Sequence, residues 1–596
     1  MRFTYITTLF AWGGLCQGVL EVFQAAPPPR STFDRPACRQ FLFEHDFGNS
    51  YGAPYVGTYL PPSGCNFTTA IFNLSVVSSG RQYDRLATLW LGDIEVWRTS
   101  TAMPIQSGIH WSFQKDMTIW HPLLTRGQKI ILDLGNLVDG DRYTGFFNVT
   151  LEALYYDDKY AAGFHSAQHI YPISTRSSSN NTTSLFSLPG DTGSVSLTIP
   201  RNAKNAVVSV TASGNGAEEF WFTNVPSEYV STFPGNEGWL YGYSPFREVQ
   251  VLIDGQLAGV SWPFPILFTG GVDPGAWRPI VGIDAFELPS FEIDISPWLG
   301  LITDGQPHTF QVRVVGFDTS AEDSIGPVGE NWWVSGSVFV WLDDTIEQTV
   351  MRNFESNIAA PSFDFHPVVG TAISENGTAT NTSLYFSLIA SRNITVSSIV
   401  ENGNIAREVA WTQSLSFSNI QNMTDLAFNQ SLAMVSSGSY SDSTSNVVSH
   451  YTYPLNLFSA YDVASSGATS NPGSVFCMAD RSKLLDGISM LSFLTGTSIG
   501  SESLETRQNV TSSYHWNRTI VEGTEGLDTM DGEVWLSYIS ATGNEAGVAA
   551  YHRYAKEKND SILVDEQGWD PIVVPRTMPL PLVPGEPIVQ RYADFH

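Results

Sequence analysis

The sequence predicts an all-β protein made of two tandem antiparallel jelly-roll-like sandwiches, followed by a further β-rich C-terminal domain. Hydrophobic residues make up 42% and aromatic residues 13% of the chain, but charged residues only 15%, a composition typical of β-rich globular proteins. Many short runs alternate apolar with polar or small residues, as half-buried strands do. At roughly 100–200 residues per domain, 596 residues allow about three to four folded units.

The alternation is clearest in the first expected domain, residues 33–160. Ala70, Phe72, Leu74 and Val76 alternate with polar or small residues. Similar runs, bounded by Gly, Asn or Asp, lie at 86–90, 94–96, 129–132 and 147–151. This pattern predicts an antiparallel β-domain.

The second expected domain, residues 193–348, repeats features of the first. In the first domain the apolar segment 119–124 precedes a run that begins at Gly127, and in the second domain 295–299 precedes a run that begins at Gly305. Each pair predicts a near-helical turn that leads through a glycine bend into a central strand, which is typical of jelly-rolls and indicates a duplication. The Ser-, Asn- and Thr-rich segment 161–192 between the domains is expected to be a linker.

Further along the chain, residues 360–565 predict another sheet, because alternating runs such as 383–388 and 534–538 lie in a region rich in Ser, Asn and Thr. The many prolines of residues 566–596 predict an extended tail.

Residues 1–26 resemble a signal peptide, with Arg2, an apolar stretch at 9–19, and Ala25 and Ala26 ahead of three prolines. No later apolar run reaches the roughly 20 residues of a spanning helix, so we expect a secreted, extracellular protein without stable membrane association. Asn-X-Ser/Thr sites support the secretory route. Glycosylation is expected at Asn66, Asn73, Asn148, Asn376, Asn381, Asn393, Asn422, Asn509 and Asn517.

The net charge indicates which class of partner the chain can bind, and the cysteines indicate where a disulfide can form. With 59 acidic and 30 basic residues, the chain should be repelled by nucleic acids, so neutral glycans or glycopeptides are more plausible partners. Cys16 would leave with the signal peptide. Cys38 and Cys65 flank an irregular segment that a disulfide would restrain, which leaves Cys477 buried and free, or paired with another molecule.

Two carboxylates stand out beside strand-like runs. Ser79-Gly80 and a short loop lead to Asp84, and Ser213-Gly214 and a short loop lead to Glu218 and Glu219. In both places an acid is expected to open the next strand at the rim of a sheet. A neighbouring Asp-Arg pair is commonly a plain surface ion pair, but the repetition suggests a reaction site.

Several blocks between residues 38 and 345 carry a family resemblance. They are 80–85, 97–102, 262–265, 269–271 and 277–280. Together they resemble the peptide-N-glycanase A (glycopeptidase A) amidase family. The resemblance implies hydrolysis of the amide between an asparagine side chain and the first N-acetylglucosamine of an N-glycan, which leaves aspartate and a glycosylamine that loses ammonia.

The same resemblance implies roles for individual residues. The family is distantly similar to bacterial peptide-N-glycanases built of two jelly-rolls, whose main catalytic Asp lies in an acid-aromatic-Asp-Arg-aromatic run. Tyr83-Asp84-Arg85 matches the core of that run, but this chain differs from the run at its first and last positions. Their second acid, in an Ala-Glu-aromatic run, corresponds to Glu219, with Glu218 as the alternative. A third acid would fall near Asp133 or Asn136.

The chemistry explains why two carboxyls are needed, because an amide must receive both an activated water and a proton. We expect Asp84 to activate water or attack directly, and Glu219 to assist. No cofactor or metal is expected. Expected substrate-binding residues are Arg85, Arg98, Asp133, Glu218, Trp262, Trp277 and Arg278. Two alternatives stay open: a secreted glycan-binding protein without catalysis, and a glycoside hydrolase that uses the paired carboxylates.

Overall fold

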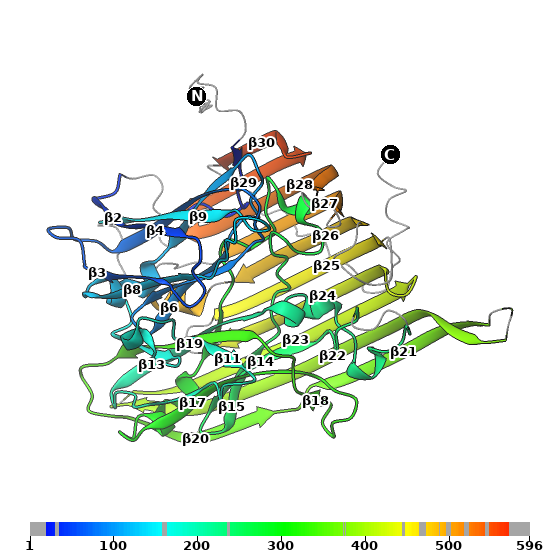
Figure 1. Cartoon of the computed structure of the whole chain (residues 1–596). Helices are drawn as coiled ribbons and strands as arrows, with labels where there is room; N and C mark the ends of the chain where they lie inside the picture. Colours follow the sequence, from blue (N-terminus) through cyan, green and yellow to red (C-terminus); the bar gives the residue numbers. More distant parts are fainter. Residues whose placement is uncertain are drawn as a thin grey trace.

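The computed structural model confirms the all-β class, with 59% of the described residues in strands and 7% in helices. Figure 1 shows two small sandwiches lying against one large sheet formed by the C-terminal half of the chain. The structure describes residues 19–29, 35–157, 164–234, 239–373, 375, 377–403, 405–443, 447–463, 473–487, 489–495, 502–517, 524–542 and 547–570.

The first sandwich consists of two sheets that pack around a buried apolar core. One sheet has the order β1 (Leu20–Glu21), β7 (Ile109–Asp116), β4 (Thr69–Ser79), β9 (Phe146–Tyr156) and β2 (Cys38–Phe47). The other has the order β3 (Tyr55–Tyr59), β8 (Gln128–Leu134), β5 (Leu86–Leu91) and β6 (Ile94–Ser100). The expected alternation is confirmed, since Phe72, Leu74 and Val76 are buried in this core.

The cysteine predictions are also confirmed. A disulfide joins Cys38 to Cys65 across a Cα–Cα distance of 6.4 Å, and Cys477 is free and buried.

The second sandwich has the same two-layer construction. One layer has the order β10 (His169–Ile173), β19 (Trp332–Leu342), β13 (Ala203–Gly214) and β16 (Phe291–Asp294), and β11 (Phe186–Leu188) also pairs with β19. The other has the order β12 (Ser194–Leu197), β17 (His308–Phe317), β14 (Arg247–Ile253) and β15 (Gln256–Ser261), with β18 (Ile325–Gly326) paired to β17. The segment 161–192 is therefore more than a linker, because β10 and β11 lie within it.

The repeated turn appears in both sandwiches. In the first, η1 (Thr118–Trp120) and α1 (His121–Leu124) lead into β8, which lies between β3 and β5. In the second, η7 (Ser296–Trp298) and α2 (Leu299–Ile302) lead into β17, which lies between β12 and β14. The two inner strands β4 and β13 also correspond, and the candidate acids follow the ends of these two strands.

One antiparallel sheet of eleven strands forms the C-terminal part. Its order is β20 (Thr349–Ile358), β22 (Ala379–Asn402), β23 (Ile405–Thr424), β24 (Asn429–Asp442), β25 (Val447–Val463), β26 (Gly473–Gly487), β27 (Glu502–Asn517), β28 (Thr524–Thr542), β29 (Gly547–Lys558) and β30 (Ser561–Asp570), with β21 (Ser362–Ile373) paired to β22. A short helix, α3 (Met490–Thr495), follows β26.

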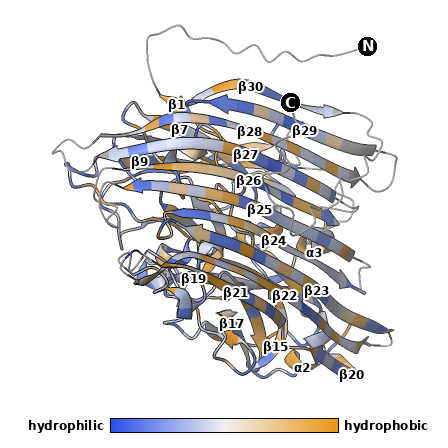
Figure 2. Cartoon of the chain, turned by 90° about the vertical axis from the view of Figure 1, so that its right-hand side faces the viewer, coloured by the Kyte–Doolittle hydropathy of each residue, from blue (hydrophilic) through white to orange (hydrophobic). Residues whose placement is uncertain are grey.

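This sheet has two different faces. Leu384, Phe386 and Leu388 are buried on the face that meets the sandwiches, whereas Tyr385 and Ile389 on the opposite face are exposed; Figure 2 looks onto the long strands with their alternating hydropathy. The sheet exceeds the expected range of 360–565 at both ends, since it begins at Thr349 and ends at Asp570. The rest of the expected tail, 571–596, lies outside the described residues.

The last residues of the expected signal peptide contact the rest of the chain. Leu20 pairs in parallel with Ile109, Val22 is only 1% exposed, and the Phe23 ring lies 4.0 Å from the guanidinium of Arg553 on β29. A cut after residue 26 would remove β1 and these contacts, and the boundary at 26 stays a prediction. Residues 1–18, including Cys16, lie outside the described part of the chain.

No helix in the described parts of the chain is long and apolar enough to cross a membrane.

Candidate active site

Asp84 lies in the irregular connection between β4 and β5, at one rim of the first sandwich. Gly80 has a φ of +99°, which a side chain would oppose, and turns the chain out of β4. Arg81 donates its backbone N–H to the Thr144 hydroxyl at 2.9 Å, and the buried Gln82 donates to the carbonyls of Leu137 and Gly145 at 2.8 and 3.2 Å. These hydrogen bonds, rather than pairing in a sheet, hold the connection in place.

Arg85 is fixed beside Asp84 by residues of the first sandwich. Its guanidinium donates to the side-chain oxygens of Gln82 at 2.7 Å and Asn136 at 3.4 Å, and lies 6.0 Å from the centre of the Tyr51 ring. Of the two positions considered for a third site residue, Asn136 therefore contacts Arg85. Asp133 lies on β8 opposite Thr88, and burial raises its pKa.

Glu219 lies at a rim of the second sandwich, but it does not open a strand as expected. After β13 the chain forms short 3-10 turns, η3 (Gly216–Glu218), η4 (Trp221–Thr223) and η5 (Ser227–Tyr229), and the next strand begins only at Arg247. Glu219 follows η3 directly, and its backbone N–H donates to the carbonyl of Gly216 at 3.1 Å. Its side chain is half-buried.

Glu218 has a different environment, which corrects its expected substrate-binding role. It is 1% exposed and forms a two-bond ion pair with Arg247, at 2.7 and 2.9 Å. Trp332 Nε1 and the backbone N–H of Gly329 donate to its two oxygens at 2.7 and 2.9 Å. Both oxygens of Glu218 are thus occupied by protein donors, whereas Glu219 is half-buried.

A Thr-Gly-Gly loop at residues 269–271 contacts both Asp84 and Phe220, the residue after Glu219. The backbone N–H of Gly270 donates a hydrogen bond to the Asp84 carboxylate. A Cβ on Gly270 would lie 2.2 Å from Asp84 Oδ1, and a Cβ on Gly271 would lie 2.8 Å from the Phe220 ring. Sequence reasoning assigned this loop no role, although its glycine pair was a signal that other groups approach the backbone closely.

The two carboxyls influence each other's ionisation. Burial raises the pKa of Glu219 to about 8, and the negative charge of Asp84 adds to this rise. Burial also raises the pKa of Asp84, but the Gly270 N–H and the charge of Arg85 act against that rise. The Gly270 N–H and the Arg85 charge favour the ionised form of Asp84, so Asp84 is the more acidic carboxyl of the two.

The remaining expected arginines have partners elsewhere. Arg98 is 2% exposed, forms an ion pair with Glu95 at 2.7 Å, and donates to the Ser213 hydroxyl and the Trp333 carbonyl. It therefore joins the two sandwiches, and its guanidinium is already bound by protein groups. Arg278 is 6% exposed and its Nε donates to Asp560 at 2.9 Å, so it joins the second sandwich to the large sheet.

The two expected tryptophans are buried as well, each at 1% exposure. Trp262 donates its Nε1–H to Glu248 at 3.0 Å and packs against Phe246. Trp277 donates its Nε1–H to the carbonyl of Gly271 at 2.8 Å. Neither ring can stack on a sugar, but Trp277 supports the loop next to Asp84.

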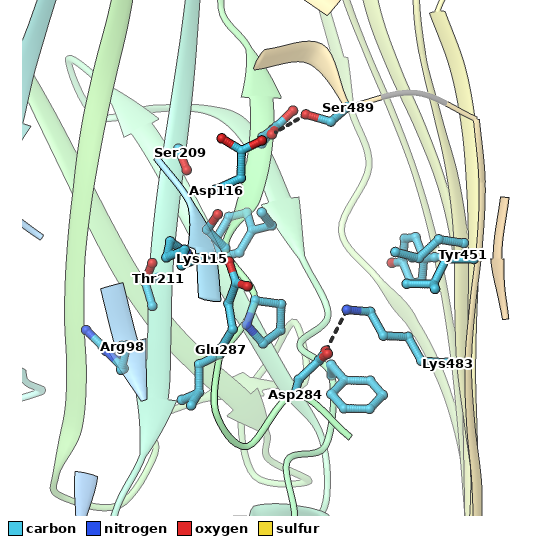
Figure 3. A pocket seen from close by; sticks show the side chains of 18 of the residues that line it. Arg98, Lys115, Asp116, Ser209, Thr211, Asp284, Glu287, Tyr451, Lys483 and Ser489 are labelled. Carbon is cyan, nitrogen blue, oxygen red and sulfur yellow. Dashed lines mark hydrogen bonds and ion pairs between the residues drawn. The ribbon is translucent and has the colours of Figure 1, made fainter. Parts of the chain in front are cut away.

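A cavity of about 540 Å³ lies between the sandwiches and the large sheet, away from the two acids. Arg98 and Trp262 line it, while Asp84 and Glu219 do not. Figure 3 shows Lys483 reaching across this cavity to Asp284, with an Nζ–Oδ2 distance of 2.5 Å. The cavity therefore does not mark the candidate active site.

The Gly270→Ala substitution tests the close approach at the loop. The added methyl group would overlap Asp84 Oδ1, so the carboxylate or the loop must move, and a displacement of about 1 Å is expected to lower kcat up to about 10²-fold. Gly48→Ala is the matched control, because a Cβ there meets nothing within 4 Å. The activity implied by the family resemblance is measured as release of glycan from a glycopeptide, and wild-type kcat in Gly270→Ala would contradict this geometry.

Two family models and a relative of known name match this chain. A family model described as peptide N-acetyl-β-D-glucosaminyl asparaginase amidase A matches residues 26–357, and a model of the PNGase A C-terminal domain matches residues 385–455. The peptide-N4-(N-acetyl-β-glucosaminyl)asparagine amidase A of Prunus dulcis is 33% identical, in a match that covers 74% of this chain and 77% of that protein.

Two solved structures show a weaker likeness. A peptide-N(4)-(N-acetyl-β-D-glucosaminyl) asparagine amidase is 13% identical with a TM-score of 0.32, covering 51% of this chain and 95% of that chain. PNGF-II is 15% identical with a TM-score of 0.34, covering 51% of this chain and 65% of that chain. At these TM-scores the two structures support no inference about this chain, whereas the first family model spans more than half of it.

Proposed function

This chain belongs to the family of peptide N-acetyl-β-D-glucosaminyl asparaginase amidase A, and we propose that Asp84 and Glu219 are its catalytic carboxyls. The protein is an amidase that cleaves N-glycans from the asparagine of glycopeptides. The single observation that carries the residue assignment is the close packing of Gly270 against Asp84 and of Gly271 against Phe220, the neighbour of Glu219. The directions of the pKa shifts agree with it, because Asp84 has donors that favour its ionised form and burial raises the pKa of Glu219 to about 8.

The two protonation states match the two needs of amide hydrolysis. Ionised Asp84 takes a proton from water as the water oxygen bonds to the amide carbon. Protonated Glu219 gives its proton to the amide nitrogen as the carbon–nitrogen bond breaks, so that nitrogen leaves as a neutral glycosylamine. Proton transfer from Asp84 back to Glu219 through water restores the starting state.

Aromatic side chains near Asp84 support the binding of a sugar. The rings of Tyr83 and Tyr143 lie 5.7 Å apart, and Tyr51 is 65% exposed beside Arg85. Such rings offer apolar faces to sugar C–H groups, while the Arg85 guanidinium can donate to a carbonyl or hydroxyl oxygen. We propose that these groups bind the N-acetylglucosamine next to the scissile amide.

One experiment separates amide hydrolysis from the alternatives. The protein is incubated with a defined N-glycopeptide in heavy-oxygen water, and the peptide is analysed by mass spectrometry. The amidase converts the glycosylated Asn to Asp with one heavy oxygen. A peptide that retains one N-acetylglucosamine would instead indicate a glycosidase, and an unchanged peptide would indicate a binding protein; either result rejects the proposal.

We also propose that the protein is secreted and glycosylated. The Cys38–Cys65 disulfide suits an oxidising compartment, and the expected sites Asn66, Asn393 and Asn422 are exposed. Asn376 lies outside the described residues. Mass analysis of the protein purified from its culture medium tests this proposal, and an unmodified peptide at every site would contradict the glycosylation.

A further inference from the structure

The large sheet turns buried polar side chains toward the second sandwich. Asn419 and Gln421 on β23 and Ser512 on β27 are all 0% exposed. Burial of a polar side chain lowers the stability of the fold unless the side chain is hydrogen-bonded. The partners of these three side chains therefore indicate which part of the structure they support. Their partners lie in the two irregular segments that contact or carry the candidate catalytic carboxyls.

The first of these segments is the loop that contacts Asp84. Ser512 donates its hydroxyl to Asp273 Oδ2 at 2.7 Å, and Tyr461 on β25 donates its hydroxyl to the Val272 carbonyl at 3.1 Å. The backbone N–H of Asp273 in turn donates to the Gly271 carbonyl at 2.7 Å. The sheet therefore holds the residues that directly follow Gly270, whose N–H binds Asp84.

This loop has an unfavourable backbone conformation that needs outside support. Val272 has a φ of +61°, in the left-handed region that β-branched residues avoid. Such a conformation persists only where surrounding contacts enforce it, and strained residues of this kind cluster at functional sites. The Tyr461 hydroxyl bonds to the carbonyl of this same residue.

The second segment carries Glu219. Asn419 and Gln421 donate their side-chain N–H groups to the Phe222 carbonyl at 2.9 and 3.0 Å. Gln430 on β24 donates to the neighbouring Thr223 carbonyl at 3.0 Å and to Gln421 Oε1 at 2.8 Å. A connected set of amide side chains thus holds the chain three to four residues beyond Glu219.

We propose that the C-terminal sheet is a positioning element of the active site. Ser512 and Tyr461 set the loop that binds Asp84, and Asn419, Gln421 and Gln430 set the turn that presents Glu219. None of these side chains is proposed to touch the substrate. The inference rests on the catalytic roles proposed for Asp84 and Glu219, and it gives the C-terminal sheet a function in the reaction.

The test compares two small substitutions with matched controls. Ser512→Ala and Tyr461→Phe each remove one hydroxyl from the inner face. Ser513→Ala, at the next position on β27, and Tyr385→Phe, which is 38% exposed, remove the same groups from the outer face. For each variant kcat and KM are measured with a glycopeptide across a range of pH, together with the thermal melting temperature.

We expect kcat to fall about tenfold or more in the two inner-face variants, with KM within about twofold of wild type, because a misplaced catalytic group slows the chemical step. A looser loop also weakens the Gly270 N–H bond that lowers the pKa of Asp84. The acidic limb of the kcat profile should therefore move to higher pH, while the charge of Arg85 is unchanged and Glu219 stays protonated and neutral in that pH range. The outer-face controls should match wild type.

Each outcome bears on the proposal. Folded inner-face variants with wild-type kcat and an unshifted acidic limb overturn it, and so does a loss of activity that only follows a loss of folded protein. Failure of the wild-type protein to release glycan is a separate result that rejects the proposed function instead.

Discussion

Replacing Asp84 with asparagine is expected to lower kcat about 10²–10⁴-fold, the usual contribution of a catalytic base. The side-chain amide of the new asparagine cannot take a proton from water, although its oxygen can still accept a hydrogen bond from the Gly270 N–H. The measurement is single-turnover release of glycan from a glycopeptide, with Asp157→Asn as the control because Asp157 is exposed at the end of β9.

The fold should survive this substitution. Burial raises the pKa of Asp84 above its ordinary value of 3.8, so the folded state binds its proton more tightly than the unfolded state. That contribution to stability is present at low pH and is lost as pH rises through the folded pKa, which leaves an ionised carboxylate that costs stability at neutral pH. The neutral amide of the Asp84→Asn variant carries no such charge. Urea unfolding at neutral pH should give a free energy no lower than wild type, and substantial remaining activity would exclude Asp84 as the base.

The Glu219→Gln substitution is expected to lower kcat about 10²-fold or more, because a glutamine cannot supply the proton that the leaving nitrogen needs. In wild type, activity should fall above a pH of about 8, where Glu219 loses its proton, and below the pKa of Asp84. The remaining activity of Glu219→Gln should lack the alkaline limb. Glu322→Gln, at an exposed position in the second sandwich, serves as the control.

Stability gives an independent measurement on Glu219. Its folded pKa of about 8 exceeds the ordinary value of 4.5, so its contribution to the free energy of unfolding is complete below about pH 4.5 and is lost as pH rises through about 8. Wild type should therefore lose stability relative to Glu219→Gln across that window. An alkaline limb that persists in Glu219→Gln would assign the proton donor to another group.

Much of the architecture could be predicted because strands and the turns between them produce recognisable patterns in neighbouring residues. Alternation in β4, the turn before β8 and its counterpart before β17, and the Cys38–Cys65 pairing all depend on residues close in sequence. The linker segment was misjudged for the opposite reason. Strands β10 and β11 have only five and three residues, and both are stabilised by pairing with β19, about 150 residues further along the chain.

Glu218 and Glu219 show the same contrast between what neighbouring residues predict and what distant contacts decide. Nothing local distinguishes Glu218 from Glu219, because both follow Ala217 in one short segment. Arg247, Gly329 and Trp332 converge on Glu218 from distant positions. This convergence makes Glu218 a member of a buried ion pair, and we propose the catalytic role for Glu219 instead.

By itself, the sequence determined the β class, the duplicated sandwiches, the disulfide and the family to which the chain is similar, since each is encoded in local periodicity, spacing or motif. Only the tertiary structure placed Gly270 against Asp84, paired Leu20 with Ile109, and joined the large sheet to the loop beside the acids. Hydrogen bonding and pKa depend on whichever groups surround a side chain in space, and here those groups come from all three parts of the chain.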